Sequence, residues 1–491
     1  MAKPTKPPET LLVALQGRSP ELRDAVMKVL DASDAGSFAS AERAVHDAAQ
    51  HEVDALVAMA VQARISDRSL QEEARTEVHG RAHDAGAQMR SKGTKSTRVR
   101  LLGGSVVVLT ALLMLPATPR DPDERKKRGE RGKGGAGVYP ALAQLGVTDQ
   151  ATPALREAVA YQVASSRSLD AAREALGRRG ICVDHKAALR LTYSFAEDSI
   201  KARDDAILQA MSTDPTTADY ADAQANGRKL IVSLDGGRVR LKEDRPDAVD
   251  GDRRFNPQWR EPKVMIIYAI DEHGVKDPTF RSIIDVTMGD ADEVAALLVG
   301  HLRLIGARSA SHVRLIADGG SWIWARAEEI RKKSGIMQER WSEQLDLPHL
   351  IEYLGKTIAS IGPERIDRKN WLDKQKFALL ESRVVDVIAD LCSVSKDHQV
   401  DTATAIAFLR GHRSRIDFGC CRRDGQPLGS GAVESAVRRV VNLRVKGNSI
   451  YWLREHAEAV MHLRAFVVSG RWSDLVARTE ARATWRPLRV S

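Results

Sequence analysis

The chain has 491 residues, which is long for one compact domain and predicts about three. Its hydrophobic content of 43% and charged content of 29% are near globular averages and argue against a disordered or fibrous protein. Lys and Arg outnumber Asp and Glu by 75 to 66, and the resulting net charge of +9 suits a polyanionic partner, with nucleic acid the first candidate.

Cysteine usage and hydropathy limit the compartment and the cofactors. The four cysteines are scattered and show no paired Cys-x-x-Cys spacing: Cys182, Cys392, Cys420 and Cys421. A disulfide framework and a zinc site are therefore not expected, and a reducing cytosol fits. The apolar part of the longest uncharged run, Leu101 to Leu115, is shorter than the about 20 residues that a membrane helix needs. We expect a cytoplasmic, nucleoid-associated protein with no membrane partner.

The chain begins with a helical region, residues 1–90, in which apolar residues recur at the spacing of several amphipathic helices. Residues 91–138 follow. They contain the uncharged run, which predicts a buried strand pair or another core segment, and a stretch rich in Pro, Gly and charge from Pro116 to Gly137. The cations of that stretch either lie along a phosphate backbone or are simply solvated.

Residues 139–225 are predicted to form a helical, DNA-binding domain. Ser168 caps one helix, glycines at 177 and 180 end it, and a second helix begins near Asp184. Two helices joined by a short glycine turn are typical of a helix-turn-helix, which would bring Lys186 and Arg190 to DNA. An ordinary helical hairpin remains an open alternative.

Residues 226–346 have a β-rich pattern that predicts a mixed sheet. Three strands come first, followed by a helix from Asp290, a fourth strand, a helix from Ser321 and a fifth strand. The strand runs are Leu230–Leu234, Val264–Ile270, Phe280–Val286, Val313–Ala317 and Glu339–Leu345. Parallel neighbours need a helical crossover, so hairpin-connected strands that feed one predict a mixed sheet in the order found in ribonuclease H-like folds.

Two acidic residues follow strands of this sheet. Asp235 and Asp318 are each the first polar residue after an apolar strand, and each continues as Asp-Gly-Gly. Asp-Gly is also a common hairpin turn, an alternative that suits Asp235 better than Asp318, where a helix follows. If the two strands are neighbours, the carboxylates repel one another unless a divalent cation neutralises them. Hard oxygen ligands indicate Mg²⁺, for which Mn²⁺ can substitute.

A third acid and a group of cations occur near the end of the chain. Glu434 lies in a helical stretch after Gly429-Ser430-Gly431, and by itself a helical Glu is most often a solvated surface residue. The cations that follow it favour a role beside DNA: Arg438, Arg439, Arg444 and Lys446. Trp452, beyond them, either packs in the core or contacts DNA.

In this order the motifs resemble bacterial insertion-sequence DDE transposases of the Kra type, over about residues 140–475. The quoted blocks are Asp235-Gly236, Trp259-Arg260-Glu261-Pro262-Lys263, Asp318 to Trp324, Asp346-Leu347-Pro348-His349, Gly429 to Ser435, Arg444-Val445-Lys446 and Trp452. The resemblance implies that Asp235, Asp318 and Glu434 are the catalytic, metal-binding triad. It also implies that His349 supports the active site, although a core histidine is the alternative from the residues alone.

The interval between the second and third acids is long, and its helical pattern predicts an all-helical insertion over residues 347–428. The insertion either contacts DNA or braces the core. Residues 429–491 are then the catalytic helix and a basic helical end. We therefore expect a multidomain protein with an α-helical DNA-binding N-terminal half and an α/β ribonuclease H-like core interrupted by that insertion.

The expected function is that of a DNA transposase, which binds the terminal repeats of a mobile element and catalyses metal-dependent strand cleavage and strand transfer. Its partner is double-stranded DNA, from element ends and target, and pairing two ends requires a homodimer or a higher oligomer. A ribonuclease H-like nuclease or resolvase without strand transfer needs the same acids. A domesticated DNA-binding protein that uses only its helical domain is a further alternative.

Overall fold

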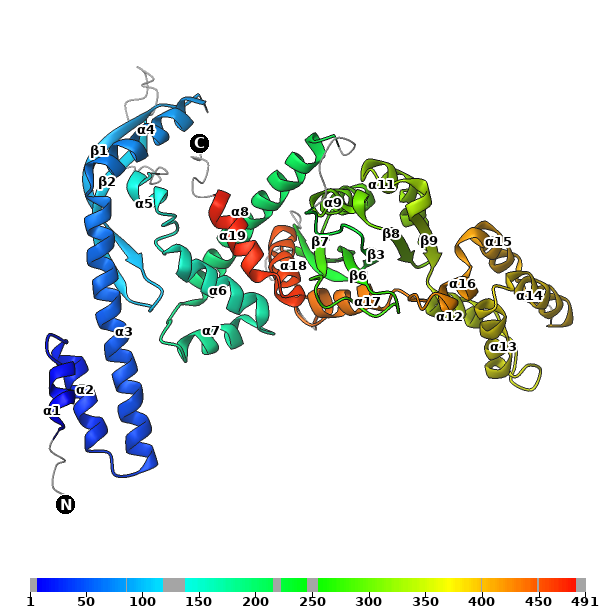
Figure 1. Cartoon of the computed structure of the whole chain (residues 1–491), viewed down its shortest axis with the longest axis horizontal. Helices are drawn as coiled ribbons and strands as arrows, with labels where there is room; N and C mark the ends of the chain where they lie inside the picture. Colours follow the sequence, from blue (N-terminus) through cyan, green and yellow to red (C-terminus); the bar gives the residue numbers. More distant parts are fainter. Residues whose placement is uncertain are drawn as a thin grey trace. The chain divides into compact units, whose positions relative to one another are not determined.

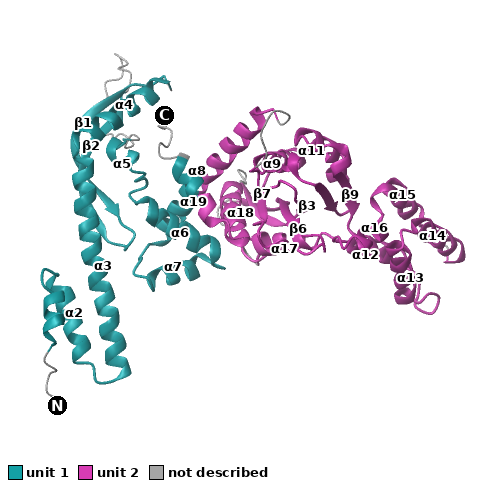
Figure 2. Cartoon of the chain, viewed as in Figure 1, with its two compact units in different colours: residues 1–195, 476–491 teal, residues 196–475 magenta. Residues whose placement is uncertain are grey.

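The computed structural model describes residues 7–84, 86–117, 137–214, 222–244, 255–398, 400–447 and 450–482. The chain divides into two compact units, residues 1–195 with 476–491, and residues 196–475 (Figure 2). Most of the predicted basic linker, residues 118–136, lies outside the described residues. Of the helices that are described, none combines the length and apolar character needed to cross a membrane.

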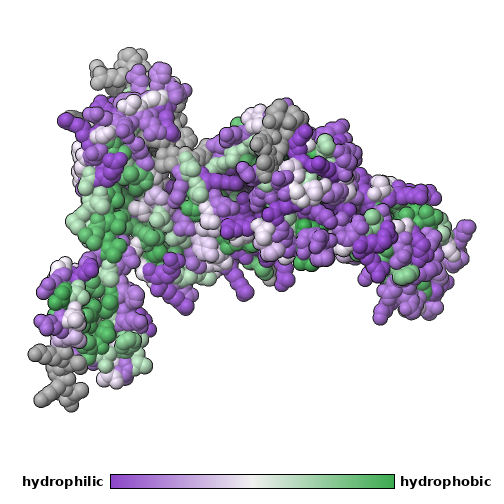
Figure 3. Space-filling model, in the orientation of Figure 1, coloured by the Kyte–Doolittle hydropathy of each residue, from purple (hydrophilic) through white to green (hydrophobic). Residues whose placement is uncertain are grey.

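The first unit begins with four helices, which confirms the predicted helical region (Figure 1). They are α1 (Glu9–Ala14), α2 (Pro20–Leu30), α3 (Ala35–Ile65) and α4 (Arg68–Asp84). Ser19 caps α2, and Asp34 forms a capping box with Ser37 at the start of α3. Hydrophobic side chains gather along α3 (Figure 3), where Leu56 and Met59 are 54% and 62% exposed. This helix therefore carries apolar residues on more than the face that it buries.

A two-stranded ribbon follows, β1 (Met89–Arg100) paired antiparallel with β2 (Val106–Pro116). The prediction of a strand pair within Leu101 to Leu115 was wrong in its pairing, because residues 101–105 form the turn and β2 pairs with the polar segment before it. A polar strand can serve as partner because the ribbon is only partly buried: Leu109, Ala111 and Met114 point into the unit, while Val106 and Val108 are exposed.

The predicted helix-turn-helix segment consists of α5 (Pro140–Gln144), α6 (Pro153–Ser165), α7 (Leu169–Gly177) and the start of α8 (His185–Ser212). Ser168 caps α7 as predicted, since its hydroxyl accepts a hydrogen bond from the Ala171 amide. Gly180 has a φ of +80°, which permits the tight turn between α7 and α8. Residues of α6, α7 and α8 share one apolar cluster that includes Leu155, Leu176 and Leu191.

The second unit contains a five-stranded mixed sheet, and all five strands predicted from the sequence are present. They are β3 (Lys229–Gly236), β6 (Lys263–Ile270), β7 (Ile283–Thr287), β8 (His312–Ala317) and β9 (Trp341–Leu345). Their order across the sheet is β7-β6-β3-β8-β9. Within this sheet β6 pairs antiparallel with both β3 and β7, whereas β8 and β9 run parallel to β3. This is the mixed sheet that the hairpins and the crossover helix predict.

Helices pack against both faces of the sheet. One face packs in an apolar core with α9 (Ala291–Leu304), α10 (Ser321–Trp324) and α11 (Ala327–Lys333). The helix α17 (Gly431–Val437) packs against β3 and β6, and α18 (Arg454–Ser469) packs against β7. Between them α17 continues as a π-helical turn, Arg438–Asn442, and α19 (Trp472–Arg482) follows α18.

A second ribbon, β4 (Val239–Asp244) paired with β5 (Phe255–Arg260), was not predicted. Its sequence signal is the alternation of Val239 and Leu241 with charged residues, a period of two that is easily hidden in so polar a segment. The segment 347–428, expected to be helical, is helical in the structure, and its apolar cluster extends to Leu345 of β9. Its helices are α12 (Leu347–Thr357), α13 (Arg368–Leu380), α14 (Val384–His398), α15 (Ala403–Gly411) and α16 (Phe418–Arg423).

The sheet contains one fully buried carboxylate, Asp285 in β7. It lies 3.2 Å from the guanidinium of Arg203 in α8 and accepts a hydrogen bond of 2.8 Å from the His301 ring in α9. Burial alone would raise the pKa of Asp285, but Arg203 and the neighbouring histidines hold it well below its usual range. The carboxylate therefore stays ionised and connects the sheet to two helices.

Replacement of Asp285 by Asn should lower the free energy of unfolding by about 3–5 kcal/mol, because it leaves the buried Arg203 with only the exposed carboxylate of Asp204 as its counter-charge. Urea denaturation at pH 7 measures the change. The matched control is Asp292→Asn, which removes an ion pair between Arg326 and an exposed carboxylate and should leave the midpoint almost unchanged. Equal effects of the two substitutions would contradict the assignment of Asp285 as a structural counter-ion.

Candidate functional site

The predicted acids Asp235 and Asp318 lie at the same edge of the sheet. In the parallel pair of β3 and β8, Val232 is opposite Leu315, and each acid is three residues further along its strand. Asp235 accepts a hydrogen bond of 2.6 Å from the Gly236 amide, and Asp318 accepts one of 2.9 Å from the Gly320 amide, each through Oδ1. Within the described residues, neither Oδ2 accepts a hydrogen bond, so one oxygen of each carboxylate remains available to a ligand.

Glu434 is presented to this edge by α17. Val433 and Val437 of this helix are buried against the sheet, while Glu434 is exposed. The helix can pack closely here because residue 237 is a glycine, at which a Cβ would lie only 3.0 Å from Val441 in the turn after α17. A larger residue at 237 would push the helix away from the strand that carries Asp235.

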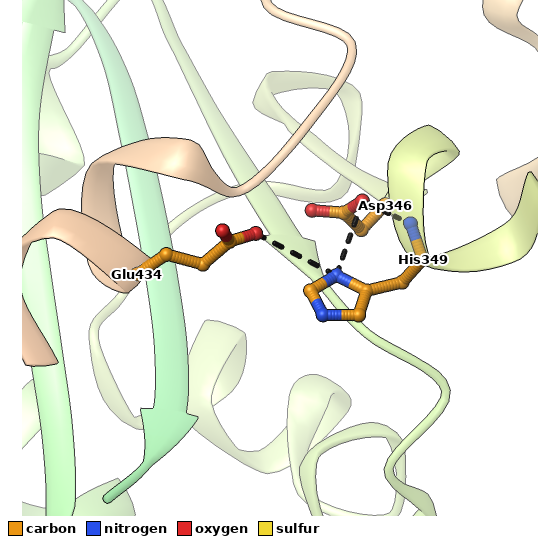
Figure 4. A group of neighbouring side chains, drawn as sticks. All are labelled: Asp346, His349 and Glu434. Atoms are coloured by element: carbon orange, nitrogen blue, oxygen red, sulfur yellow. Dashed lines mark hydrogen bonds and ion pairs between the residues drawn. The ribbon is translucent and has the colours of Figure 1, made fainter. Parts of the chain in front are cut away.

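Figure 4 shows Glu434 directed toward His349 of α12, whose ring lies between two carboxylates. The Nδ1 atom of His349 is 3.7 Å from Oε1 of Glu434 and 3.3 Å from Oδ1 of Asp346. Nδ1 is buried and has no hydrogen-bond partner among the described groups. These three residues form a group whose ligand atoms all lie within 4.8 Å of one another.

Asp346 has a different role from the other acids, because hydrogen bonds already occupy both of its oxygens. It is fully buried, and Oδ1 accepts from the His349 amide at 2.9 Å, capping α12. Its Oδ2 accepts from the amide of Ser430, at 2.5 Å, and from the Ser430 hydroxyl. The residue thus joins the end of β9 to the loop before α17, and so positions His349 and Glu434 relative to each other.

The acids and the histidine interact electrostatically. The pKa of Asp235 is raised to about 6, chiefly by burial and also by the negative charges of Asp318 and Glu434, while the hydrogen bond from the Gly236 amide and the charge of His349 oppose the rise. For His349, burial would lower the pKa, but the surrounding carboxylates, led by Asp346, outweigh burial and raise it. The site therefore favours an additional proton or another positive charge.

The donors at this sheet edge are of the kind that divalent cations prefer, and the group of ligand atoms that lies within 4.8 Å consists of Asp346, His349 and Glu434. Asp235, Asp318 and Glu434 offer carboxylate oxygens, the ligands that Mg²⁺ and Mn²⁺ prefer, and the two aspartates each keep an oxygen without a hydrogen bond. Clustered carboxylates with a raised pKa are the electrostatic signature of a site that gains from a bound cation. The unpartnered Nδ1 of His349 is a further donor on the same side.

Two residues at the rim were not identified as site residues from the sequence. The ammonium of Lys263 is 4.6 Å from the centre of the Trp322 ring and 2.9 Å from Oε1 of Glu261. Lys263 pairs with Gly236 in the sheet, and Trp322 follows the Asp318 turn, so both stand beside the acids. The sequence contains Lys263 as the last residue of the block Trp-Arg-Glu-Pro-Lys. Its position beside the acids depends on the pairing of β3 with β6, which the sequence alone does not give.

The cations near Glu434 that were predicted to bind DNA differ in their exposure to solvent. Arg438, Arg439 and Lys446 are exposed. Arg444 is only 7% exposed, with its guanidinium 5.4 Å from the centre of the Trp452 ring. The prediction that Arg444 contacts a phosphate is therefore corrected: a buried guanidinium on an indole has a packing role.

Trp452 is half-buried and packs against the ribbon, and its predicted DNA contact stays a prediction. Its backbone amide donates to the Arg240 carbonyl at 3.0 Å, and its carbonyl accepts from the Lys242 amide at 2.8 Å, which makes an isolated β-bridge with Leu241 at the edge of the ribbon of β4 and β5. The indole N–H donates to the Val445 carbonyl at 3.0 Å.

The other predicted DNA contacts, Lys186 and Arg190, are exposed on the first turns of α8. They line a cleft of about 420 Å³ together with Arg98 and Arg100 of β1. Two acids, Asp149 and Asp184, line the same cleft, so its charge is positive but not uniform. The first unit thus gathers exposed cations on the helix that follows the glycine turn.

The family resemblance has no independent support from relatives. Comparison of the chain with family models, with curated proteins and with solved structures gives no match. A function is therefore assigned from the geometry and chemistry of the site itself.

Asp235→Asn should stabilise the protein in the absence of metal. The folded-state pKa of Asp235, about 6, is above the ordinary value of 3.8, so folded protein binds the proton more tightly and stability declines as pH rises from about 4 to 6. Above about pH 6 the carboxylate is ionised and its destabilising effect on the folded protein is fully present. Removing that charge should raise the free energy of unfolding by about 1–2 kcal/mol, a value reduced for solvent screening.

Thermal unfolding of full-length protein in EDTA, at pH 5 and pH 8, measures this gain. The Asn variant should melt above the unsubstituted protein at pH 8, and by less at pH 5. Asp373→Asn, at an exposed acid of α13, is the control and should show no pH-dependent gain. A gain that is larger at pH 5 would contradict the raised pKa.

Proposed function

We propose that the protein is a DNA transposase with a ribonuclease H-like catalytic core, in which Asp235, Asp318 and Glu434 bind divalent metal ions. The observation that carries the proposal is the convergence of three carboxylates from β3, β8 and α17 at one sheet edge, beside His349. Two acids at the ends of adjacent strands and a third on a packed helix form a site suited to phosphodiester chemistry.

The sheet order supports the core assignment. In chain order its strands lie 3-2-1-4-5 across the sheet, with the first three antiparallel and the last two parallel to the first. This is the arrangement of ribonuclease H-like folds, in which the acids belong to the first and fourth strands and to a later helix. The insertion of α12 to α16 between the fifth strand and that helix accounts for the long interval between Asp318 and Glu434.

When bound, two Mg²⁺ ions would activate the attacking oxygen and stabilise the leaving oxygen of an in-line displacement. The carboxylates of Asp235 and Asp318 face this position from the sheet, and Glu434 faces it from the helix. The surrounding carboxylates raise the pKa of His349 and so favour its protonated form, in which the ring can donate a hydrogen bond to a phosphate oxygen. Asp346 keeps that imidazole and Glu434 in register.

Cleavage and strand transfer are the same displacement carried out with different nucleophiles. Water attacks in the first step and releases a 3′-hydroxyl, and that hydroxyl attacks a target phosphodiester in the second. Arg438 and Arg439, exposed on the turn beyond Glu434, hold the backbone near the acids. Pairing two element ends requires at least a homodimer on DNA.

The acids can be tested directly on duplex DNA that carries the repeats flanking the gene. Asp235→Asn, Asp318→Asn and Glu434→Gln should each reduce Mg²⁺-dependent cleavage by more than about 100-fold, because each removes a ligand charge from the ions. Affinity for the same duplex, measured without metal, should change only a few fold, because phosphate contacts come from cations elsewhere.

The control for this series is Glu352→Gln, an exposed acid one turn beyond His349 in α12, which should retain full cleavage. Cleavage that survives in Glu434→Gln would remove that residue from the triad. Products in which the cleaved 3′ end is joined to a second duplex identify a transposase, whereas cleavage without joining identifies a nuclease.

Terminal recognition is assigned to the first unit. Replacing both Lys186 and Arg190 by Ala should weaken binding to the terminal duplex and reduce the slope of log affinity against log salt by about 0.9 for each DNA phosphate that the variant no longer neutralises. The double variant Arg178→Ala/Arg179→Ala, in the turn before α8, is the control with the same charge change. An unchanged salt slope in the Lys186/Arg190 variant would place end recognition outside α8.

A further inference from the structure

The ribbon of β4 and β5 begins four residues after Asp235, so it leaves the sheet at the edge that carries the acids. Trp452 forms an isolated β-bridge with Leu241 at its edge. The ribbon thus belongs to the same unit as the acids and is connected to the first of them through Gly236 and Gly237.

The two faces of the ribbon differ sharply in composition. Val239 and Leu241, on the inner face, are 0% and 4% exposed. The outer face carries Arg240 and Lys242 from β4, and Phe255 and Trp259 from β5, since Arg240 pairs with Trp259 in the register. Cations and aromatic rings therefore alternate on the side that faces away from the buried residues.

These side chains form a continuous ladder. The guanidinium of Arg240 lies 4.9 Å from the centre of the Trp259 ring and 5.5 Å from that of Tyr451. Tyr451 packs edge-on against Phe255, with ring centres 5.2 Å apart, and the ammonium of Lys242 is 5.2 Å from the Phe255 ring. The ladder holds its rings in fixed positions, which lowers the entropic cost of stacking a planar ligand on them.

Internal packing explains part of the ladder but not the position of Trp259. Tyr451 and Phe255 are half-buried, whereas Trp259 is 51% exposed, the one tryptophan among the exposed large apolar residues of the described chain. Arg240 covers one region of the indole and leaves the remainder open to solvent. An exposed indole held in place by a cation is suited to a planar ligand that carries negative charge.

We propose that this outer face binds an unpaired DNA strand next to the cleavage site, with a base stacked on Trp259 and with Arg240 and Lys242 along its phosphates. Unpaired bases present their π-faces, which a duplex keeps within its stack, and stacking on aromatic rings tolerates any base. This choice of ligand rests on the proposed function, since a strand separated at the cleavage site supplies the unpaired nucleotides.

The test measures binding of a 15-nucleotide oligothymidine and of a 15-base-pair duplex to the full-length protein in EDTA, by fluorescence anisotropy. Trp259→Ala should weaken oligothymidine binding by about 5- to 100-fold, the effect of losing one stacked base, and leave duplex binding within about 3-fold. Trp259→Phe should bind nearly as tightly as the unsubstituted chain. Equal oligothymidine affinities of the unsubstituted and Trp259→Ala proteins would overturn the proposal.

The matched control is Phe377→Ala, another exposed aromatic residue under an arginine, with the Arg383 guanidinium 5.7 Å from its ring centre. It should leave oligothymidine binding unchanged, and a loss equal to that of Trp259→Ala would overturn the assignment to the ribbon. An independent measurement needs no variant: oligothymidine with one 5-iododeoxyuridine should crosslink to Trp259 on irradiation. A peptide map with no crosslink in residues 255–260 would overturn the proposal.

This test is separable from that of the proposed function. Asp235→Asn should keep its oligothymidine affinity in EDTA, because the carboxylate is not part of the ladder. If Trp259 does not stack on a base but metal-dependent cleavage is intact, only the proposed strand-binding surface is overturned. If Trp259 stacks on a base but the protein does not cleave DNA, only the proposed transposase function is overturned.

Discussion

Carboxylates gathered at one edge of a sheet repel one another, and neighbouring side chains offset part of that repulsion. Asp235, Asp318 and Glu434 belong to three different elements. Burial and the charges of the other two acids raise the pKa of Asp235 to about 6, which shows that its ionised form is disfavoured here. A raised pKa at His349 partly offsets the repulsion with an imidazolium, and Lys263 adds a cation at the rim. A bound metal ion would offset it more completely, which is why the arrangement favours metal-dependent chemistry over a purely structural role.

Such a strained group of charges needs a rigid support, and Asp346 provides it. Its buried carboxylate accepts hydrogen bonds from His349, three positions along the chain, and from Ser430, which is 84 positions away. A five-helix insertion that includes His349 lies between Asp346 and Ser430. Its apolar cluster extends to Leu345 of β9, directly before Asp346, so the insertion is packed onto the end of that strand while Asp346 and Ser430 join its two ends.

The sequence was sufficient to predict the five strands, the helix of Glu434 and the positions of the acids, because apolar strands and inward-facing valines leave periodic signals. It did not distinguish Arg444 from Lys446, since burial of one basic residue beside another depends on where Trp452 packs. The ribbon was missed for a related reason: Val239 and Leu241 are its only buried pair in β4, too short a pattern to recognise among charged residues. The connecting role of Asp346 depends on contacts across the insertion, which no local pattern contains.

Burial also changes how the net charge of +9 should be interpreted. Every buried Lys or Arg side chain in the described part of the chain is an arginine: Arg156, Arg203, Arg314, Arg444, Arg464 and Arg471. A planar guanidinium can satisfy several acceptors or stack on a ring when desolvated, whereas a buried ammonium is harder to compensate. These arginines contribute to the basic pI while serving the fold. The cations relevant to a nucleic acid are the exposed ones, and they occur on α8, beyond Glu434 and on the ribbon, near the surfaces to which the proposals assign DNA.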